Sequence, residues 1–152
     1  MWGFGFGKPT YNPIVIINTS RLCIEVIIVE WLPDVEIYLR DCTLDRAVAW
    51  AASQVGPLLG PFDCGKAITY HPAIGSVVIT SSIEGGAFLS LWFNTSARPW
   101  ATDLECARAA APDLGCIVRC DPGSTFPNVS PHSDVLLEIS GTDNLLIPTD
   151  AL

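Results

Sequence analysis

The chain has 152 residues, of which 49% are hydrophobic and 16% are charged, and its formal net charge is −8. This length and composition exclude a disordered chain and predict a single domain, residues 1–152, with a buried core. The negative charge disfavours nucleic acid as a partner, because phosphate contacts need a basic surface.

Residues 1–13 are rich in Gly and aromatic residues and have no period, which indicates either an ordered arm or a flexible tail. They hold no basic cluster followed by an apolar run, so we expect no secretory signal. The β-branched runs at 14–17 and 22–31 predict strands. Because polar and charged residues interrupt these runs, none reaches the ~20 apolar residues of a membrane span. We therefore expect a cytoplasmic protein without a membrane span.

The next segments carry clear local signals. The alternation of apolar and polar residues from Val35 to Leu39 predicts a strand with one apolar face. Thr43 is a suitable N-cap for a helix whose apolar residues repeat with a 3.6-residue period up to Val55. The following stretch, residues 56–66, is rich in Gly and Pro and predicts a loop.

A hairpin and a second helix follow. Two apolar runs, at 76–82 and 87–94, flank a Glu-Gly-Gly turn and predict the hairpin. The second helix is predicted from Thr102, which forms a Thr-x-x-Glu capping box with Glu105, to Gly115.

Two further strands are predicted at 116–120 and 134–140, and a turn leads into a closing apolar segment. Strand pairs joined by short turns, separated by two helices, are typical of an α+β fold. We expect an antiparallel or mixed sheet with both helices packed on one face.

The segment between these last strands, "CDPGSTFPNVSPHSD", is the main candidate for chemistry. It holds the residue types of a catalytic triad, but neighbours in an extended segment hardly reach triad geometry. Cys116, Cys120, Asp121 and His132 are metal-ligand types. However, two thiols four residues apart on a strand lie about 13 Å apart, which is too far for one tetrahedral ion. We expect no metal, no cofactor and no catalytic residue, and interpret the six cysteines mainly as small buried residues in a reducing compartment.

The same segment has the features of a binding loop. Its Asp-Pro-Gly sequence predicts a turn, and two further prolines keep the rest extended, which reduces the entropy lost on binding. The loop also lies in the acidic third of the chain. Residues 101–152 hold eight acidic residues against Arg108 and Arg119. This charge indicates either a surface that keeps the protein soluble or a docking surface for a basic partner.

Three segments, "SIEGGAFLSLWFNT", "RPWATDLECARAAAPDLGCIVRCDPG" and "VSPHSDVLLEI", resemble parts of small bacterial immunity proteins. These proteins belong to polymorphic-toxin and contact-dependent or type VI effector systems. The resemblance covers about residues 68–140 and leaves out the apolar N-terminal third. It implies a cytoplasmic α+β inhibitor that binds one cognate protein toxin. It carries no catalytic motif.

We expect the toxin to bind on the polar loop and the acidic strand after it. We also expect Arg98 and Trp100 to anchor the toxin, because Arg and Trp are enriched at binding hot spots. The alternative for Trp100 is that it packs in a cluster at the start of the second helix. The expected partner-binding residues are Arg98, Trp100, Asp121, Asn128, Ser130, His132, Asp134 and Glu138.

Two other functions stay open. The first is a self-associating structural or phage-derived protein whose apolar stretches, 14–32 and 87–93, form an oligomer edge. The second is a small enzyme that uses Cys or His. A homodimer is also compatible with the immunity hypothesis.

Overall fold

The chain divides into two compact units, residues 1–32 and 33–152. In the first unit the structure describes one short antiparallel pairing, between β1 (Val15–Ile16) and β2 (Ile27–Ile28). The expected arm at 1–13 and the remainder of the two β-branched runs lie outside the described residues. The structure is a computed structural model, and it describes residues 15–16, 27–28, 34–83, 86–130 and 133–148.

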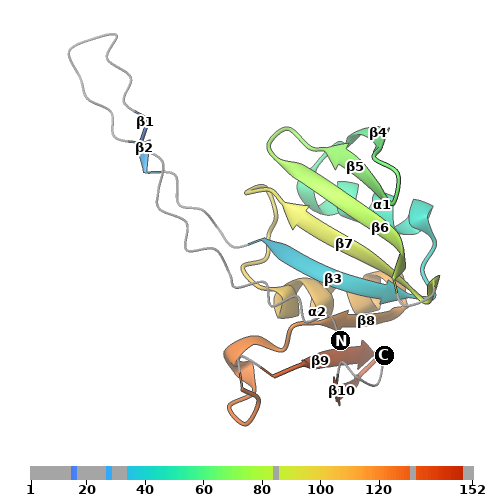
Figure 1. Cartoon of the computed structure of the whole chain (residues 1–152), viewed down its shortest axis with the longest axis vertical. Helices are drawn as coiled ribbons and strands as arrows, with labels where there is room; N and C mark the ends of the chain where they lie inside the picture. Colours follow the sequence, from blue (N-terminus) through green and yellow to red (C-terminus); the bar gives the residue numbers. More distant parts are fainter. Residues whose placement is uncertain (1–14, 17–26, 29–33, 84–85, 131–132, 149–152) are drawn as a thin grey trace. The chain divides into compact units, whose positions relative to one another are not determined.

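The second unit is built on one sheet of eight strands, all antiparallel to their neighbours. The strand order is β10-β9-β8-β3-β7-β6-β5-β4, and the sheet is open (Figure 1). The sheet and its two helices confirm the predicted α+β class. The strands are β3 (Val35–Arg40), β4 (Leu59–Asp63), β5 (Ala67–His71), β6 (Ser76–Ile83), β7 (Phe88–Asn94), β8 (Ile117–Cys120), β9 (Val135–Ser140) and β10 (Asp143–Pro148).

Helices α1 (Leu44–Val55) and α2 (Asp103–Leu114) cover the same face of the sheet and lie behind it in Figure 1. Each begins as its sequence predicts. The Thr43 side chain accepts from the Arg46 N–H in α1, and the Thr102 side chain accepts from the Glu105 N–H in α2. Each helix also ends at a Gly with positive φ. Neither helix of the described part of the chain has the length and apolar character needed to cross a bilayer.

The core lies between the helices and the sheet, and an aromatic cluster holds its centre. Trp50 of α1 stacks on Trp100, with ring centroids 5.2 Å apart, and Phe93 of β7 packs edge-on against both rings. The indole N–H of Trp50 donates to Asp113 Oδ2 of α2 at 3.0 Å. The cluster therefore joins both helices to the middle of the sheet.

Strand alternation divides the side chains between two faces. Val35, Ile37 and Leu39 of β3 point to the helix side and are at most 1% exposed. The other side of the sheet, which we call the outer face, carries the alternate residues and their cross-strand partners. The outer-face residues used below are Glu36, Tyr38, Arg40, Phe88, Ser90, Trp92, Arg119, Glu138 and Leu145.

The loop prediction for residues 56–66 is wrong over Leu59–Asp63, which form the edge strand β4. Pro61 and the preceding Gly suggest a loop from sequence. An edge strand can accept them, because its outer side needs no N–H for pairing. The pairing of β4 with β5 is accordingly irregular, with a register shift between Leu59 and Phe62.

Candidate protein-binding surface

Four acidic residues from three segments of the chain meet at one end of the sheet. The antiparallel pairing of β3 with β8 places Ile37 opposite Cys120, so the start of β3 lies beside the end of β8. Helix α2 begins at the same end, because Asp103 Oδ1 accepts from the Glu36 backbone N–H at 3.1 Å. We call this set of residues the acidic end. It comprises Asp34, Glu36, Asp103 and Asp121.

The pKa of Asp103 reports the electrostatic environment of the acidic end. Burial raises the pKa of this carboxyl, the hydrogen bond from the Glu36 N–H lowers it, and the nearby Asp121, Glu36 and Asp34 carboxylates raise it further. The resulting pKa is about 6, against an ordinary value of 3.8. The acidic end therefore carries mutual repulsion that a cationic group from a partner would relieve.

The loop from Asp121 to Asp134 continues directly from the acidic end. Its first turn is closed by Asp121 Oδ1, which accepts from the Gly123 N–H at 2.7 Å, and a single 3₁₀ turn follows (Gly123–Thr125). Two later backbone hydrogen bonds, each 2.9 Å, close further turns: Val129 N–H to the Phe126 carbonyl and Ser133 N–H to the Ser130 carbonyl. The loop is thus shaped by its own turns.

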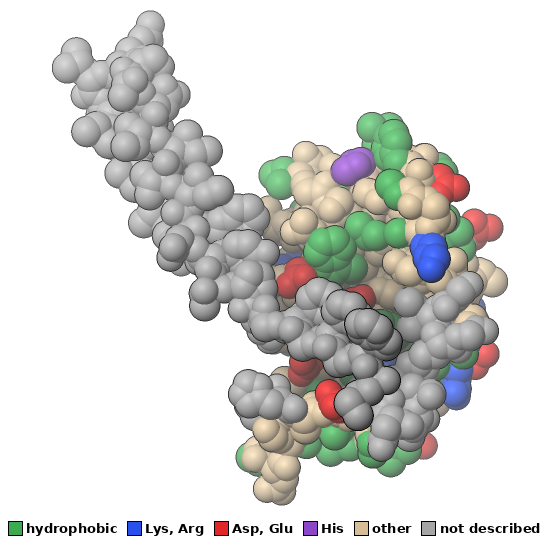
Figure 2. All heavy atoms as spheres, in the orientation of Figure 1, with side chains coloured by type: hydrophobic (Ala, Val, Ile, Leu, Met, Phe, Trp, Pro, Cys, Tyr) green, Lys and Arg blue, Asp and Glu red, His purple; other side chains and the backbone are tan. Residues whose placement is uncertain are grey.

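Four of the expected binding residues lie together on this loop. Asp121, Asn128, Ser130 and Asp134 are all exposed, so they are accessible to a partner. The loop is orange in Figure 1, and Figure 2 shows acidic side chains on the side of the body where β3 begins. The fifth loop residue of the prediction, His132, lies outside the described residues.

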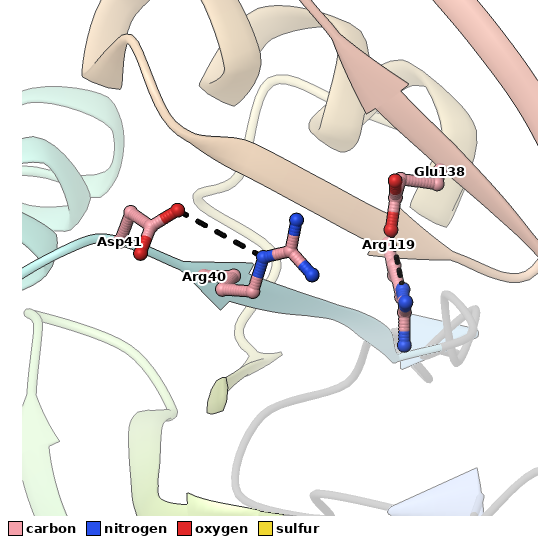
Figure 3. A network of polar contacts seen from close by, with 4 residues as sticks. All are labelled: Arg40, Asp41, Arg119 and Glu138. Carbon is pink, nitrogen blue, oxygen red and sulfur yellow. Dashed lines mark hydrogen bonds and ion pairs between the residues drawn. The ribbon is translucent and has the colours of Figure 1, made fainter. Parts of the chain in front are cut away.

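Glu138 has a different environment from the loop residues. It lies on the outer face of β9, where its Oε2 accepts from Arg119 Nε at 2.8 Å, and both side chains are largely buried (Figure 3). Arg119 also lies over the Phe88 ring, 4.4 Å from its centroid. By contrast, the second ion pair of Figure 3, Arg40 with Asp41, is 3.8 Å long and exposed. The charge of Glu138 is therefore largely compensated within the protein.

The two expected anchors are buried. Trp100 is 8% exposed and belongs to the aromatic cluster, which is the alternative that the sequence left open for it. Arg98 is 7% exposed. Because neither side chain presents much surface, we leave both out of the candidate site.

Sequence reasoning missed two residues beside the acidic end. The Trp92 indole N–H donates to Asp34 Oδ2 at 2.7 Å, and Ser90 Oγ donates to Glu36 Oε1 at 2.5 Å. Asp34 was interpretable only as a turn residue, since its partner lies 58 positions later in the chain. Ser90 and Trp92 are two positions apart in the strand predicted at 87–94, so strand alternation puts them on one face, and this was the signal available.

His71 and the buried cysteines, which a Cys- or His-dependent enzyme could use, have the contacts and burial of structural residues. His71 Nδ1 lies 3.1 Å from the Gly75 carbonyl oxygen, and its ring packs 5.4 Å from Phe62. Burial raises the pKa of the Cys106 thiol, and it raises that of Cys120 to about 12. Over the described ranges, no group of three or more His, Cys, Asp and Glu residues is placed to hold a metal ion.

The candidate site is thus the acidic end together with the Asp121–Asp134 loop, which share Asp121. Charge and pre-formed shape are its two physical properties. Comparisons with protein-family models, with curated proteins and with solved structures find nothing that matches this chain.

Proposed function

We propose that this protein is an immunity protein, a cytoplasmic inhibitor that binds one cognate bacterial toxin and blocks it without turnover. The observation that carries the proposal is the Asp121–Asp134 loop, which is closed by its own hydrogen bonds while the polar side chains that the structure describes there stay exposed. A loop with a pre-formed shape loses less conformational entropy when a partner binds. The resemblance of residues 68–140 to immunity proteins directs the proposal to a toxin.

Charge indicates the kind of toxin surface. Burial first, and the neighbouring carboxylates of the acidic end in addition, raise the pKa of Asp103 to about 6, and these carboxylates repel one another at neutral pH. Lys or Arg side chains of a toxin would relieve this repulsion and would also speed the encounter. A toxin with a basic active-site rim therefore suits this surface best.

The pKa values of the buried thiols weigh against their use in catalysis. A catalytic thiol needs a lowered pKa, because the thiolate is the reacting species. Burial instead raises the pKa of Cys42, Cys106, Cys116 and Cys120. These four thiols stay protonated near neutral pH, which weighs against each of them as a catalytic thiol.

The test uses the protein encoded beside this chain as the candidate toxin. Co-expression should suppress the growth defect that the toxin causes, and the purified pair should bind. Asp121→Asn combined with Asp134→Asn should slow association and weaken its dependence on salt, because both changes remove charge from the loop. Asn keeps the oxygen that accepts from the Gly123 N–H, so the shape of the turn is retained.

A matched control lies on the edge strand β4, away from the Asp121–Asp134 loop. Asp63 is exposed and its Oδ1 accepts from the Gly65 N–H at 2.7 Å, the same turn as at Asp121. Asp63→Asn therefore removes one charge from a turn equivalent to that at Asp121; it is compared with Asp121→Asn alone and should leave binding unchanged. Equal effects of the loop and control variants would contradict the proposed surface, and absence of binding to the neighbouring protein would contradict the proposed function.

A further inference from the structure

The two edges of the eight-stranded sheet are built differently. Edge strand β4 contains Pro61, is out of regular register with β5 between Leu59 and Phe62, and ends in an acid. Prolines, irregular pairing and charge are the devices that keep an edge strand from pairing with another chain. The opposite edge, β10, pairs with β9 in continuous register from Asp143 to Pro148. Apart from Asp143 at its start and Pro148 at its end, β10 has none of these devices.

Strand β10 is also apolar and accessible on both faces. Leu145 lies opposite Glu138 on the outer face, and Leu146 lies opposite Leu137 on the helix side. Their side chains are 61% and 38% exposed. Figure 2 shows hydrophobic side chains at the lower end of the body, where Figure 1 draws β9 and β10. An accessible, regular, apolar edge strand presents its N–H and C=O groups to a further strand.

We infer that β10 pairs antiparallel with β10 of a second copy of this chain, across a two-fold axis that continues the sheet. In such a pairing, facing residues must lie on the same face of the joined sheet. Centring the axis on Leu146 then places Leu146 opposite its own copy and Leu145 opposite Ile147. The three central pairs are apolar, Asn144 faces Pro148, and Asp143 lies beyond Pro148 of the other copy. No carboxylate of the strand therefore faces an apolar residue in this register.

The strand itself selects this register. Centring the axis one residue earlier, on Leu145, would place Leu146 opposite Asn144 and Ile147 opposite Asp143. That alternative sets a leucine against an amide and an isoleucine against a carboxylate, which costs free energy on burial. The sequence Leu-Leu-Ile thus complements itself in only one of these two registers, which favours a second copy over an unrelated strand as the occupant.

The size and charge of the contact predict its strength. One six-residue strand covers less area than the ~1,200–2,000 Å² of a stable interface, so we expect monomer and dimer to exchange. Each copy carries a net charge of −8, which opposes association. Added salt screens this repulsion and should strengthen the dimer. Toxin binding through the acidic loop should respond to salt in the opposite direction, so the two proposals can fail separately.

The test is sedimentation velocity on the full chain over about two decades of protein concentration. The wild-type chain should shift from monomer to dimer, and Leu145→Lys should remain monomeric. Leu59→Lys is the matched control, because Leu59 is 69% exposed on the other edge strand. It should dimerise like the wild type. Circular dichroism of each variant checks that the fold is retained.

A cross-linking experiment tests the same β10 pairing without a variant that disrupts it. In a Cys64→Ser background, Leu146→Cys places one thiol opposite its own copy, and oxidation with diamide should link two chains through a disulfide. Leu59→Cys in the same background should not form this link. A chain that stays monomeric at all concentrations would overturn the inference, as it would mean that β10 stays open or is covered from within the same chain. Equal loss of dimer in Leu145→Lys and Leu59→Lys would overturn it too.

Discussion

Replacing Asp103 by Asn should stabilise the protein at neutral pH. The Asp103 carboxyl has a pKa of about 6 because it is buried and faces other carboxylates of the acidic end. Asn retains an oxygen that can accept from the Glu36 N–H, which now donates to Asp103 Oδ1 at 3.1 Å. The substitution therefore removes the charge and keeps the hydrogen bond between α2 and β3.

The magnitude follows from the difference between the two pKa values. The folded value of about 6 lies above the ordinary value of 3.8, and each pKa unit corresponds to about 1.4 kcal/mol. Ionising Asp103 thus costs about 3 kcal/mol at most when the protein is folded. A carboxylate at a helix start gains ~0.3–1 kcal/mol from the helix dipole, and Asn loses this gain. We expect a net stabilisation of about 1–2 kcal/mol at pH 7.

The direction of the Asp103 pKa shift also determines how the stability of the protein depends on pH. From pH 3.8 to about 6, the folded protein holds the Asp103 proton that the unfolded chain has lost. The contribution of this residue to stability therefore falls as pH rises through that window. The difference between Asp103→Asn and the wild type should be small at the acid end of the window and should reach its full size above pH 6.

Urea unfolding followed by Trp fluorescence at a series of pH values measures this difference. The control is Asp45→Asn, which removes an exposed acid from the first turn of α1 and should cost ~0.3–1 kcal/mol at pH 7. A gain in Asp103→Asn that is equal at all pH values, or a loss of stability at pH 7, would refute the reasoning.

Three further outcomes test the fold. Arg119→Ala should cost about 3–5 kcal/mol in urea unfolding, since it leaves the largely buried Glu138 carboxylate without its 2.8 Å partner, and adding Glu138→Gln should recover part of the loss. Trp100→Ala should cost about 3–5 kcal/mol by the same assay, because its ring lies within the aromatic cluster; a loss as small as that expected for an exposed Trp would contradict that packing. Iodoacetamide should modify the exposed Cys64 before the buried Cys106 in the native protein, as peptide mass spectrometry will show, and early labelling of Cys106 would contradict its burial.

Much of the fold could be predicted because its signals are local. Thr43 and Thr102 cap their helices as expected, and the buried residues of β3 follow the alternation of its sequence. These features depend on residues a few positions apart, which a single sequence displays directly. The α+β class followed from the order of such elements.

The strand order and the site depended on contacts that no local pattern shows. Arg119 occupies an outward strand position, yet it is buried because Phe88 and Glu138 reach it from other strands. Similarly, Trp92 meets Asp34 only because β7 pairs with β3. The exposed loop was predictable from its prolines and its Asp-Pro-Gly turn, whereas the clustering of the four acids of the acidic end required the folded arrangement.

The position of β3 in the sheet constrains how the protein can be synthesised. This strand leaves the ribosome first among the eight, yet its neighbours are β7, which places Phe93 opposite Val35, and β8, which places Cys120 opposite Ile37. Its apolar residues therefore remain without their final partners until translation has passed Cys120. Such long-range pairing is slow to form and exposes nascent chains to aggregation. A transcript truncated before that codon would yield a chain destined for a chaperone or a protease.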